Sequence, residues 1–249
     1  MAWRSTSSSA EPERSGASAG SSTTTSPSAE PERSGASAPS FRQVSNWRES
    51  ITGVPAAPRL VLVGPPAAGK STLGELVAER TGAPFVDLDA VGDRYYGEVG
   101  WSVERLVERI AVVGRVAAER EWEPARAHAV RRVVAESPGA VVALGAGHTA
   151  YTVGEHRSTV RTALADVPHV VLVVPAADRD TALTELRRRS VASKGTDWVR
   201  DGHDLLAGWF DDPGTRGLAT ATLVTGNEGP ATAVTRLVAL LDGRTGGRR

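Results

Sequence analysis

A short glycine-bearing segment constrains the fold of this chain more than any other feature. Residues 64–71 follow the pattern G-x-x-x-x-G-K-[ST]. The apolar run Leu60–Val63 before it is typical of a buried strand, and Leu73, Leu76 and Val77 after it have helical spacing. A strand, a glycine loop and a helix in this order form a phosphate-binding loop. We therefore expect the chain to bind a nucleotide.

The residues of this phosphate loop (64–71) have separate expected roles. Main-chain N–H groups of the loop and of the helix start would surround the phosphates. Lys70 would reach the outer phosphates and the Ser71 hydroxyl would bind Mg²⁺. Lys70 is one of only two lysines among the 29 basic residues, at a position that favours a compact ammonium. The residues expected to contact the nucleotide are Gly64, Pro65, Pro66, Ala67, Ala68, Gly69, Lys70, Ser71 and Thr72.

The first 55 residues differ in composition from the rest of the chain. They are rich in Ser, Ala, Pro and Glu, and the segment at 9–19 is repeated at 28–38. Such a segment cannot bury enough apolar surface to offset the entropy of ordering it. We expect a disordered arm at 1–55, one domain at 56–242 and a flexible tail at 243–249.

Composition excludes several classes of protein. The chain has no cysteine, so disulfides, thiolate metal sites and a thiol nucleophile are absent. Its 29 basic and 29 acidic residues balance, which gives no case for nucleic-acid or membrane binding. No apolar run is long enough for a membrane span. We expect a cytoplasmic monomer whose partner is a small molecule.

Apolar runs alternate with helical patterns from residue 58 to residue 242. This alternation predicts an α/β fold with a parallel sheet covered on both faces. The predicted strands are Leu60–Val63, Pro84–Leu88, Ala140–Leu144, His169–Val174 and Ala221–Val224. The predicted helices are Ser71–Arg80, a pair within Ser102–Ala135 that breaks or restarts at Pro124, Asp178–Arg189 and Pro230–Leu241.

Ligands of such sheets bind beyond the carboxyl ends of the strands. The second predicted strand is followed by Asp87 and Asp89, two residues apart and so on one side of an extended chain. The third is followed by Gly145-Ala146-Gly147, which leaves room for a ligand. The third and fourth strands end in Gly145 and Pro175 rather than in the acid that a P-loop hydrolase needs. The pattern favours phosphoryl transfer to a bound acceptor.

With these features the chain resembles the shikimate kinase family of small P-loop kinases. The resemblance is carried by Gly-Pro-Pro-Ala-Ala-Gly-Lys-Ser-Thr at 64–72, Pro-Phe-Val-Asp-Leu-Asp at 84–89 and Leu-Gly-Ala-Gly at 144–147. It covers most of residues 58–242. It implies a three-layer P-loop kinase fold with a five-stranded parallel sheet, and the use of ATP and Mg²⁺.

The resemblance also implies roles for individual residues. Ser71 and Asp87 would serve Mg²⁺, directly or through water. Asp89 would hold the acceptor hydroxyl and take its proton, and Gly145, Ala146 and Gly147 would line the acceptor pocket. The segment 190–204 would be a lid whose Arg200 or Lys194 closes on the phosphates, which makes Arg200 a candidate catalytic residue. Residues 226–230 would lie beside the adenine.

The acceptor half departs from the family pattern. The family has an aromatic-Arg-Arg-x-Glu stretch whose arginine binds a substrate carboxylate, whereas this chain has Trp122-Glu123-Pro124-Ala125-Arg126. The expected arginine falls on Glu123 or Pro124, and Arg126 replaces the glutamate as a candidate acceptor contact. A second family arginine meets Asp211-Asp212-Pro213, with Arg216 nearby but out of register. His148, directly after the glycine loop, is a further residue to test as an acceptor contact.

Three functions stay open at this point. The first is an ATP-dependent kinase acting on a hydroxyl of a small polar metabolite, shikimate included. The second is a phosphotransferase for a natural product, sugar or nucleoside on the same scaffold, which the Glu123 and Arg126 exchange favours. The third is a nucleotide-binding regulatory module without kinase activity.

Overall fold

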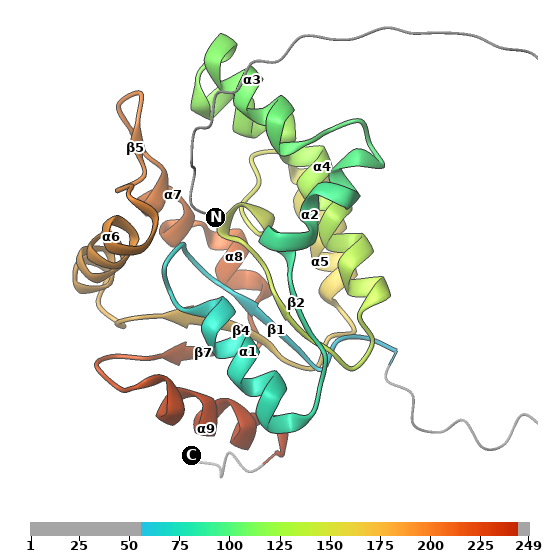
Figure 1. The fold of residues 1–249 in the computed structure, drawn as a ribbon, viewed down its shortest axis with the longest axis vertical. Coiled ribbons are helices and arrows are strands. Elements are labelled where there is room, and N and C mark those ends of the chain that lie inside the picture. The colour runs from blue at the N-terminus through green and yellow to red at the C-terminus, as the bar shows by residue number, and fades with distance from the viewer. Residues whose placement is uncertain (1–55, 244–249) are drawn as a thin grey trace, which may run out of the picture. The chain divides into compact units, whose positions relative to one another are not determined.

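A computed structural model describes residues 56–243 of the chain, in which five strands form one parallel sheet (Figure 1). The strand order is β2-β3-β1-β4-β7. The bounds are β1 Leu60–Val63, β2 Phe85–Asp87, β3 Val141–Ala143, β4 Val170–Val174 and β7 Ala221–Val224. The predicted α/β fold with a five-stranded parallel sheet is confirmed. The predicted arm at 1–55 and the predicted tail, apart from Gly243, lie outside the described residues.

Strand β1 lies at the centre of the sheet, and all four of its residues are buried. It pairs in parallel with β3 through Leu60 and Val141 and with β4 through Val61 and Val170. A central parallel strand is covered on both faces, which is why its sequence is continuously apolar. Because all five strands run the same way, their carboxyl ends lie at one edge of the sheet.

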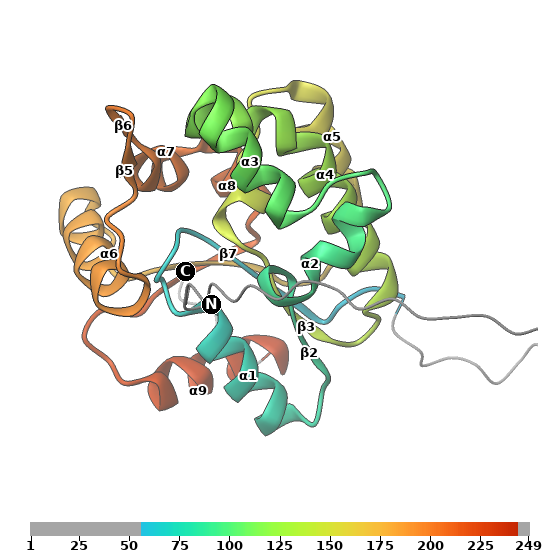
Figure 2. The ribbon, with the colours of Figure 1, turned by 45° about the horizontal axis from the view of Figure 1, so that its top comes forward.

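Two groups of helices cover the two faces, as Figure 2 shows. On one face α1 (Lys70–Thr81) packs against α9 (Pro230–Leu241). On the other, α4 (Arg115–Glu136) packs against α5 (Gly154–Leu164), which contacts α8 (Pro213–Leu218). None of the helices between residues 56 and 243 combines the length and the hydropathy needed to cross a bilayer.

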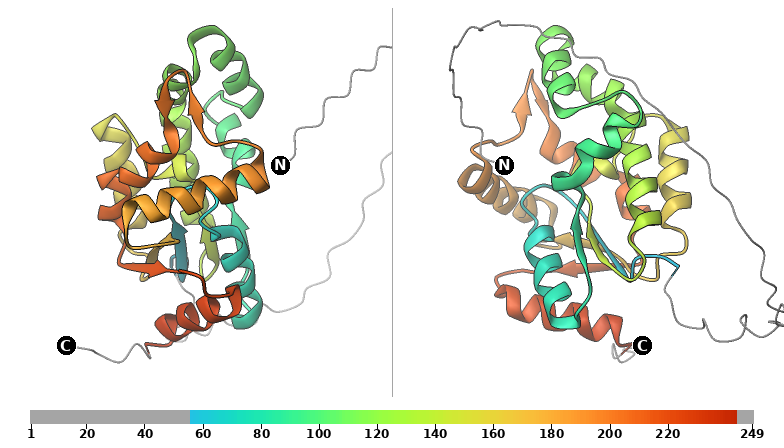
Figure 3. Two further views of the ribbon diagram at one scale, coloured as in Figure 1. Left: turned by 90° about the vertical axis from the view of Figure 1, so that its left-hand side faces the viewer. Right: turned by 45° about the vertical axis from the view of Figure 1, so that its right-hand side comes forward.

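The remaining elements lie around the carboxyl edge of the sheet. They are α2 Leu88–Gly97, α3 Val103–Val113, the 3-10 turn Ala146–His148, α6 Arg179–Lys194 and α7 Leu205–Asp211. Between α6 and α7 the strands β5 (Val199–Arg200) and β6 (His203–Asp204) form an antiparallel hairpin, which Figure 3 shows in its left view. The predicted lid segment 190–204 thus consists of the end of α6 and this hairpin.

The predicted break at Pro124 is wrong. Helix α4 runs through Pro124, and the chain breaks earlier, at Gly114 between α3 and α4. Gly114 has φ 80° and ψ 163°, a conformation that side chains disfavour and glycine tolerates. A proline removes one helical N–H donor, but the buried residues of α4 around it, such as Ala125 and Val130, keep the helix packed.

The two strand-end carboxylates are also arranged differently from the expectation. Strand β2 ends at Asp87 and helix α2 begins at Leu88, so Asp89 is helical rather than extended. Asp87 is the N-cap of α2, and its Oδ1 accepts the Asp89 main-chain N–H at 3.0 Å. The alternation rule for strands therefore does not apply to this pair. A local Asx cap, which competes with extended structure, sets their geometry instead.

Candidate active site

The phosphate loop passes close against the neighbouring strand β4. Gly64 has φ +134°, and a Cβ there would lie 2.5 Å from the carbonyl oxygen of Val173. Any side chain at this position would collide with the main chain of β4. Ala67 has φ 59°, a left-handed conformation that costs a non-glycine residue about 1 kcal/mol. The loop is thus held in a tight curve between β1 and α1.

The start of α1 is open to an anion. Its N-cap is Gly69, which has φ 96° and no side chain to cap the helix. The first N–H groups of a helix have no partner within the helix, and the helix dipole adds positive potential there. Ser71 and Thr72 are exposed on this first turn, whereas Pro65, Pro66 and Ala68 are buried beneath it. The residues expected to contact the nucleotide thus lie together at the carboxyl end of β1.

Lys70 lies folded back on its own loop. Its side chain is 9% exposed, and its Nζ donates hydrogen bonds of 2.9 Å to the carbonyl oxygens of Gly64 and Pro65. Burial lowers the pKa of Lys70 to about 8, Asp89 and Asp87 act to raise it, and Lys194 acts to lower it further. Both predicted aspartates and a lysine of the predicted lid segment therefore lie within electrostatic reach of Lys70.

We expect nucleotide binding to take up protons at pH 8. With a pKa of about 8, roughly half of Lys70 is neutral at that pH, and bound phosphates would raise its pKa and protonate it. Uptake should therefore approach half a proton per ATP at pH 8, roughly, and vanish near pH 6, where Lys70 is already charged. Calorimetry in two buffers of different ionisation enthalpy measures this. Proton release, or equal uptake in a Lys70→Met variant, would contradict the assignment.

The two residues predicted to bind magnesium, Ser71 and Asp87, both offer side-chain oxygen atoms. Asp87 uses Oδ1 to cap α2, a bond that does not involve its Oδ2, and the Ser71 hydroxyl is exposed at the start of α1. Within residues 56–243 no group of three or more His, Cys, Asp or Glu side chains is placed to hold a metal. Magnesium in kinase sites takes one or two protein oxygens and completes its shell with water and phosphate oxygens. The two residues fit that arrangement.

Asp89 lies against the glycine loop (residues 145–147). Its side chain is 57% exposed, and a Cβ on Gly145 would lie 2.0 Å from its Oδ1. Glycine at 145 is therefore what allows the Asp89 carboxylate to occupy this position. Gly147 has a similar relation to Arg126, because a Cβ there would lie 2.5 Å from its Nη1.

Replacing Gly145 with Ala is expected to displace the Asp89 carboxylate while the fold survives, because the clash is with the end of an exposed side chain. If Asp89 positions an acceptor, a displacement of about 1 Å should lower kcat by about 100-fold. Gly154→Ala is the matched control, since a Cβ at Gly154 meets no atom within 4 Å. Steady-state kinetics compares the two variants, and equal activity would contradict the placement of Asp89.

Two buried side chains, His148 and Tyr96, form a polar wall next to Asp89 and the glycine loop. His148 is 3% exposed, and its Nε2 lies 2.7 Å from the hydroxyl of Tyr96 on α2. Burial lowers the pKa of His148 to about 4, so its ring is neutral at pH 7. The Tyr96 ring packs edge-on against Trp122, with ring centroids 4.9 Å apart. No sequence pattern points to Tyr96, because the spacing of apolar residues predicts no helix at the position of α2.

Arg126 supports the glycine loop in this structure. It is 3% exposed, its Nη1 donates to the carbonyl of Gly147, and its Nη2 donates to the carbonyl of Glu119 at 3.0 Å. Its guanidinium also lies over the rings of Trp122 and Tyr151, at 5.5 Å from each centroid. A direct contact between Arg126 and an acceptor stays a prediction.

Glu123 has a structural role at the position where an acceptor-binding arginine was expected. It is 2% exposed and accepts hydrogen bonds from the Thr152 N–H at 2.7 Å, the Thr152 hydroxyl at 2.8 Å and the Val153 N–H at 3.1 Å. Val153 is the N-cap of α5 and has no side-chain capping bond of its own. A carboxylate from α4 thus caps α5.

Glu123→Ala is expected to destabilise the fold by about 2–4 kcal/mol, because it removes a buried carboxylate that accepts three hydrogen bonds at the start of α5. Glu123→Gln is the matched variant: it keeps the shape and an acceptor oxygen, and should lose only about 1 kcal/mol. Urea unfolding measures both. Equal losses in the two variants would show that the cap contributes nothing specific.

The hairpin of the lid segment lies against the start of α4. Asp201 Oδ2 accepts the Arg115 main-chain N–H at 3.1 Å. Arg200 is exposed and turned to its own hairpin: it donates to the Val199 carbonyl at 2.7 Å and to the Thr196 hydroxyl at 2.8 Å. Arg200 would have to leave these partners to reach a phosphate, so its catalytic role stays a prediction. Lys194, by contrast, already acts to lower the pKa of Lys70.

A cleft of about 500 Å³ opens at the ends of β4 and β7. It lies on the same edge of the sheet as the phosphate loop, since β4 pairs with β1. The predicted adenine segment contributes Gly226 and Asn227 to it, and this volume suits part of a nucleotide. Its lining residues are Pro175, Ala176, Asp180, Thr181, Thr184, Glu185, Gly226 and Asn227.

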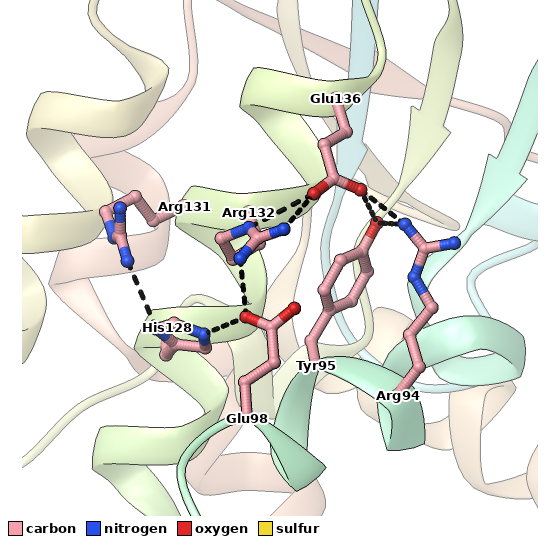
Figure 4. A network of polar contacts seen from close by, with 7 residues as sticks. All are labelled: Arg94, Tyr95, Glu98, His128, Arg131, Arg132 and Glu136. Carbon is pink, nitrogen blue, oxygen red and sulfur yellow. Dashed lines mark hydrogen bonds and ion pairs between the residues drawn. The ribbon is translucent and has the colours of Figure 1, made fainter. Parts of the chain in front are cut away.

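A polar network ties α2, which carries Asp89 and Tyr96, to α4 (Figure 4). Glu136 accepts from the Tyr95 hydroxyl at 3.0 Å and pairs with Arg94 and Arg132. Glu98 accepts from Arg132 at 2.7 Å and contacts His128 at 2.6 Å. These contacts orient α2 relative to α4 and so help to fix the wall behind the glycine loop.

Known sequences resemble this chain along the part that carries the site. The family model described as shikimate kinase matches residues 66–194, more than half of the 249 residues. A shikimate kinase of Pseudomonas savastanoi pv. phaseolicola is 28% identical over 186 residues, which is 73% of this chain and 95% of that relative. One of Streptomyces coelicolor is 40% identical over 92 residues, which is 37% of this chain and 47% of that relative. The match spans about half the length of the Streptomyces coelicolor and Mycobacterium avium relatives.

Solved structures share the fold. A shikimate kinase from Acinetobacter baumannii in complex with shikimate superposes with a TM-score of 0.54 at 18% identity, covering 78% of this chain and 96% of that one. A shikimate kinase from Aquifex aeolicus gives a TM-score of 0.50 at 18% identity, covering 76% and 99%.

Proposed function

This chain belongs to the shikimate kinase family, and on that premise we propose that it transfers the γ-phosphoryl group of ATP to a hydroxyl of a small polar metabolite. The observation that carries the proposal is the placement of Asp89 and Lys70 within electrostatic reach of each other at the carboxyl edge of the sheet. A cation for the phosphates and a carboxylate for a hydroxyl are the two groups that this reaction needs on opposite sides of the transferring group.

The phosphate loop would hold the nucleotide. Main-chain N–H groups at the start of α1 bind phosphate oxygens, and Lys70 exchanges the carbonyls of Gly64 and Pro65 for the outer phosphates. The exchange is favourable because a buried ammonium gains more from an anion than from two neutral carbonyls. The cleft at the ends of β4 and β7 would take the base.

Ser71 and Asp87 would hold Mg²⁺ together with the nucleotide. The ion would offset negative charge on the phosphate oxygens. Both protein groups offer oxygen, which this cation prefers, and the capping bond of Asp87 fixes its carboxylate beside the loop.

Asp89 would accept the proton of the acceptor hydroxyl as the new bond to phosphorus forms. Its carboxylate is 57% exposed and lies against the glycine loop, so an acceptor hydroxyl would be able to reach it. A positioned general base contributes about 10²–10⁴-fold to such a reaction.

For the acceptor we favour an uncharged polyhydroxylated molecule, such as a sugar or cyclitol. A carboxylate would need a free guanidinium, yet Arg126 is bound to main-chain carbonyls beneath the loop. Arg216 donates to the Phe210 carbonyl at 3.3 Å and lies over the Phe210 ring. The acidic residues near it are also engaged: Asp211 pairs with Arg179, and Asp212 caps α8.

The test is release of ADP from Mg²⁺-ATP in the presence of shikimate and of a panel of sugars, cyclitols and nucleosides. We expect stimulation by a neutral polyol that exceeds stimulation by shikimate. Stimulation by shikimate alone would refute the acceptor class and keep the kinase. ATP binding without stimulation by any acceptor would favour a regulatory module. The cytoplasmic location and the monomeric state stay predictions.

A further inference from the structure

The ring of His148 lies between Tyr96 and the proposed base Asp89. Its Nε2 is 2.7 Å from the Tyr96 hydroxyl, and its Nδ1 is 3.6 Å from Asp89 Oδ1. Nδ1 is buried and has no hydrogen-bond partner among the described residues. A buried nitrogen without a partner, pointing toward an active-site carboxylate, calls for a functional explanation.

The surroundings of the ring select one tautomer. A proton on Nε2 would leave the lone pair of Nδ1 facing a carboxylate oxygen, which is repulsive. A proton on Nδ1 lets the Tyr96 hydroxyl donate to Nε2 and directs the N–H at Asp89. Burial lowers the pKa of His148 to about 4, so the ring holds a single proton at pH 7. The Asp89 carboxylate and the main chain of Gly145 act to raise the pKa of His148, against the larger effect of burial.

The contact can close without moving the main chain. The Asp89 side chain is 57% exposed and free to turn, whereas the His148 side chain is 4% exposed and fixed by Tyr96. Gly145 leaves the space that a Cβ would fill, 2.0 Å from Asp89 Oδ1. A small rotation of the carboxylate brings 3.6 Å within hydrogen-bond distance.

Resting on the kinase activity proposed above, we propose that His148 is a positioning residue: its Nδ1–H holds one oxygen of Asp89 and directs the other at the acceptor hydroxyl. The acceptor oxygen bonds to the γ-phosphorus, the bond from that phosphorus to the bridging oxygen breaks, and ADP leaves. The hydroxyl proton goes to the free oxygen of Asp89. His148 keeps its proton throughout, so it acts through Asp89 rather than on the acceptor.

Ring ¹⁵N NMR of the full chain tests the tautomer without any turnover, with the His148 signals assigned by their loss in His148→Gln. We expect a pyrrole-type Nδ1 and a pyridine-type Nε2 at pH 7, and a change in the Nδ1 resonance in Asp89→Ala. The opposite tautomer, or an Nδ1 resonance that is unchanged in Asp89→Ala, would overturn the proposal. This test holds whether or not the protein phosphorylates any acceptor.

Kinetics tests the consequence in a chain that has an acceptor. His148→Gln places its amide near the Nε2 position and loses the donor to Asp89, so kcat should fall about tenfold with the KM for ATP unchanged. His148→Asn places a donor near the Nδ1 position and should recover most of that loss. Tyr96→Phe should also lower kcat, because it frees the tautomer. His128→Gln is the control, since that ring contacts Glu98 and Arg131 instead.

The outcomes separate this proposal from its premise. A wild-type chain that phosphorylates none of the acceptors refutes the proposed function. The NMR result then decides the role of His148 by itself. Equal kcat values in His148→Gln and His148→Asn, with equal losses of thermal stability, would show a packing role and overturn the proposal.

Discussion

Replacing Asp89 with Asn is expected to lower kcat about 10³-fold while the Kd for ATP changes by less than about threefold. The amide keeps the size of the carboxylate but cannot take a proton from an acceptor hydroxyl. The side chain is exposed and its main-chain N–H still binds Asp87, so the fold and the start of α2 should survive. Calorimetric ATP titration without acceptor, together with steady-state kinetics, separates the two quantities.

Asp93→Asn is the matched control for this substitution. Asp93 lies on the same helix and accepts the Val103 N–H at 2.9 Å, a contact that the amide oxygen of Asn preserves. We expect unchanged kcat in that variant. Equal loss of ATP binding and of turnover in Asp89→Asn would contradict the base role and indicate a part in nucleotide binding instead.

Lys70→Met is expected to lower kcat by about 10²–10³-fold and to weaken ATP binding as well. Methionine matches the length and the apolar stem of lysine, so the buried position should stay filled. On the proposed function the lost ammonium would be the charge nearest the phosphates, in a site where burial strengthens electrostatic interactions. Single-turnover kinetics at saturating ATP separates the loss in the chemical step from the loss in binding.

Lys194→Met is the comparison for Lys70→Met, because these two are the only lysines of the chain. Lys194 is exposed at the end of α6, and its charge acts to lower the pKa of Lys70. We expect a smaller loss of activity in Lys194→Met. A larger loss there than in Lys70→Met would move the main phosphate contact from the loop to the lid.

Local patterns predicted the sheet and the phosphate loop well, because both depend on local chemistry. Continuous apolar runs such as Leu60–Val63 can be stable only where both faces are covered. Glycines with positive φ, such as Gly64 and Gly69, mark the tight curve of the loop. The segments that the sequence did not reveal depend on distant contacts instead. Helix α5 is capped by Glu123 of α4, which lies about 30 residues earlier in the chain, so no local sequence pattern predicts that cap.

The polar wall next to Asp89 could not be predicted from the sequence for the same reason: it depends on a contact between residues far apart in the chain. His148 was singled out by its place after the glycine loop, but its partner Tyr96 lies 52 residues earlier on a helix that begins within the predicted strand end. Asp87 and Asp89 were expected side by side on a strand, whereas an N-cap joins them to a helix. The alternation rule for strands therefore predicted the wrong local geometry for this pair.

A crystal structure with Mg²⁺ and a nonhydrolysable ATP analogue tests the central claim most directly. We predict phosphate oxygens bound by main-chain N–H groups of residues 64–71, the Nζ of Lys70 moved from the carbonyls of Gly64 and Pro65 onto them, and the Asp89 carboxylate facing the γ-phosphate. An analogue bound elsewhere, with Lys70 still on those carbonyls or Asp89 turned away, would contradict the account.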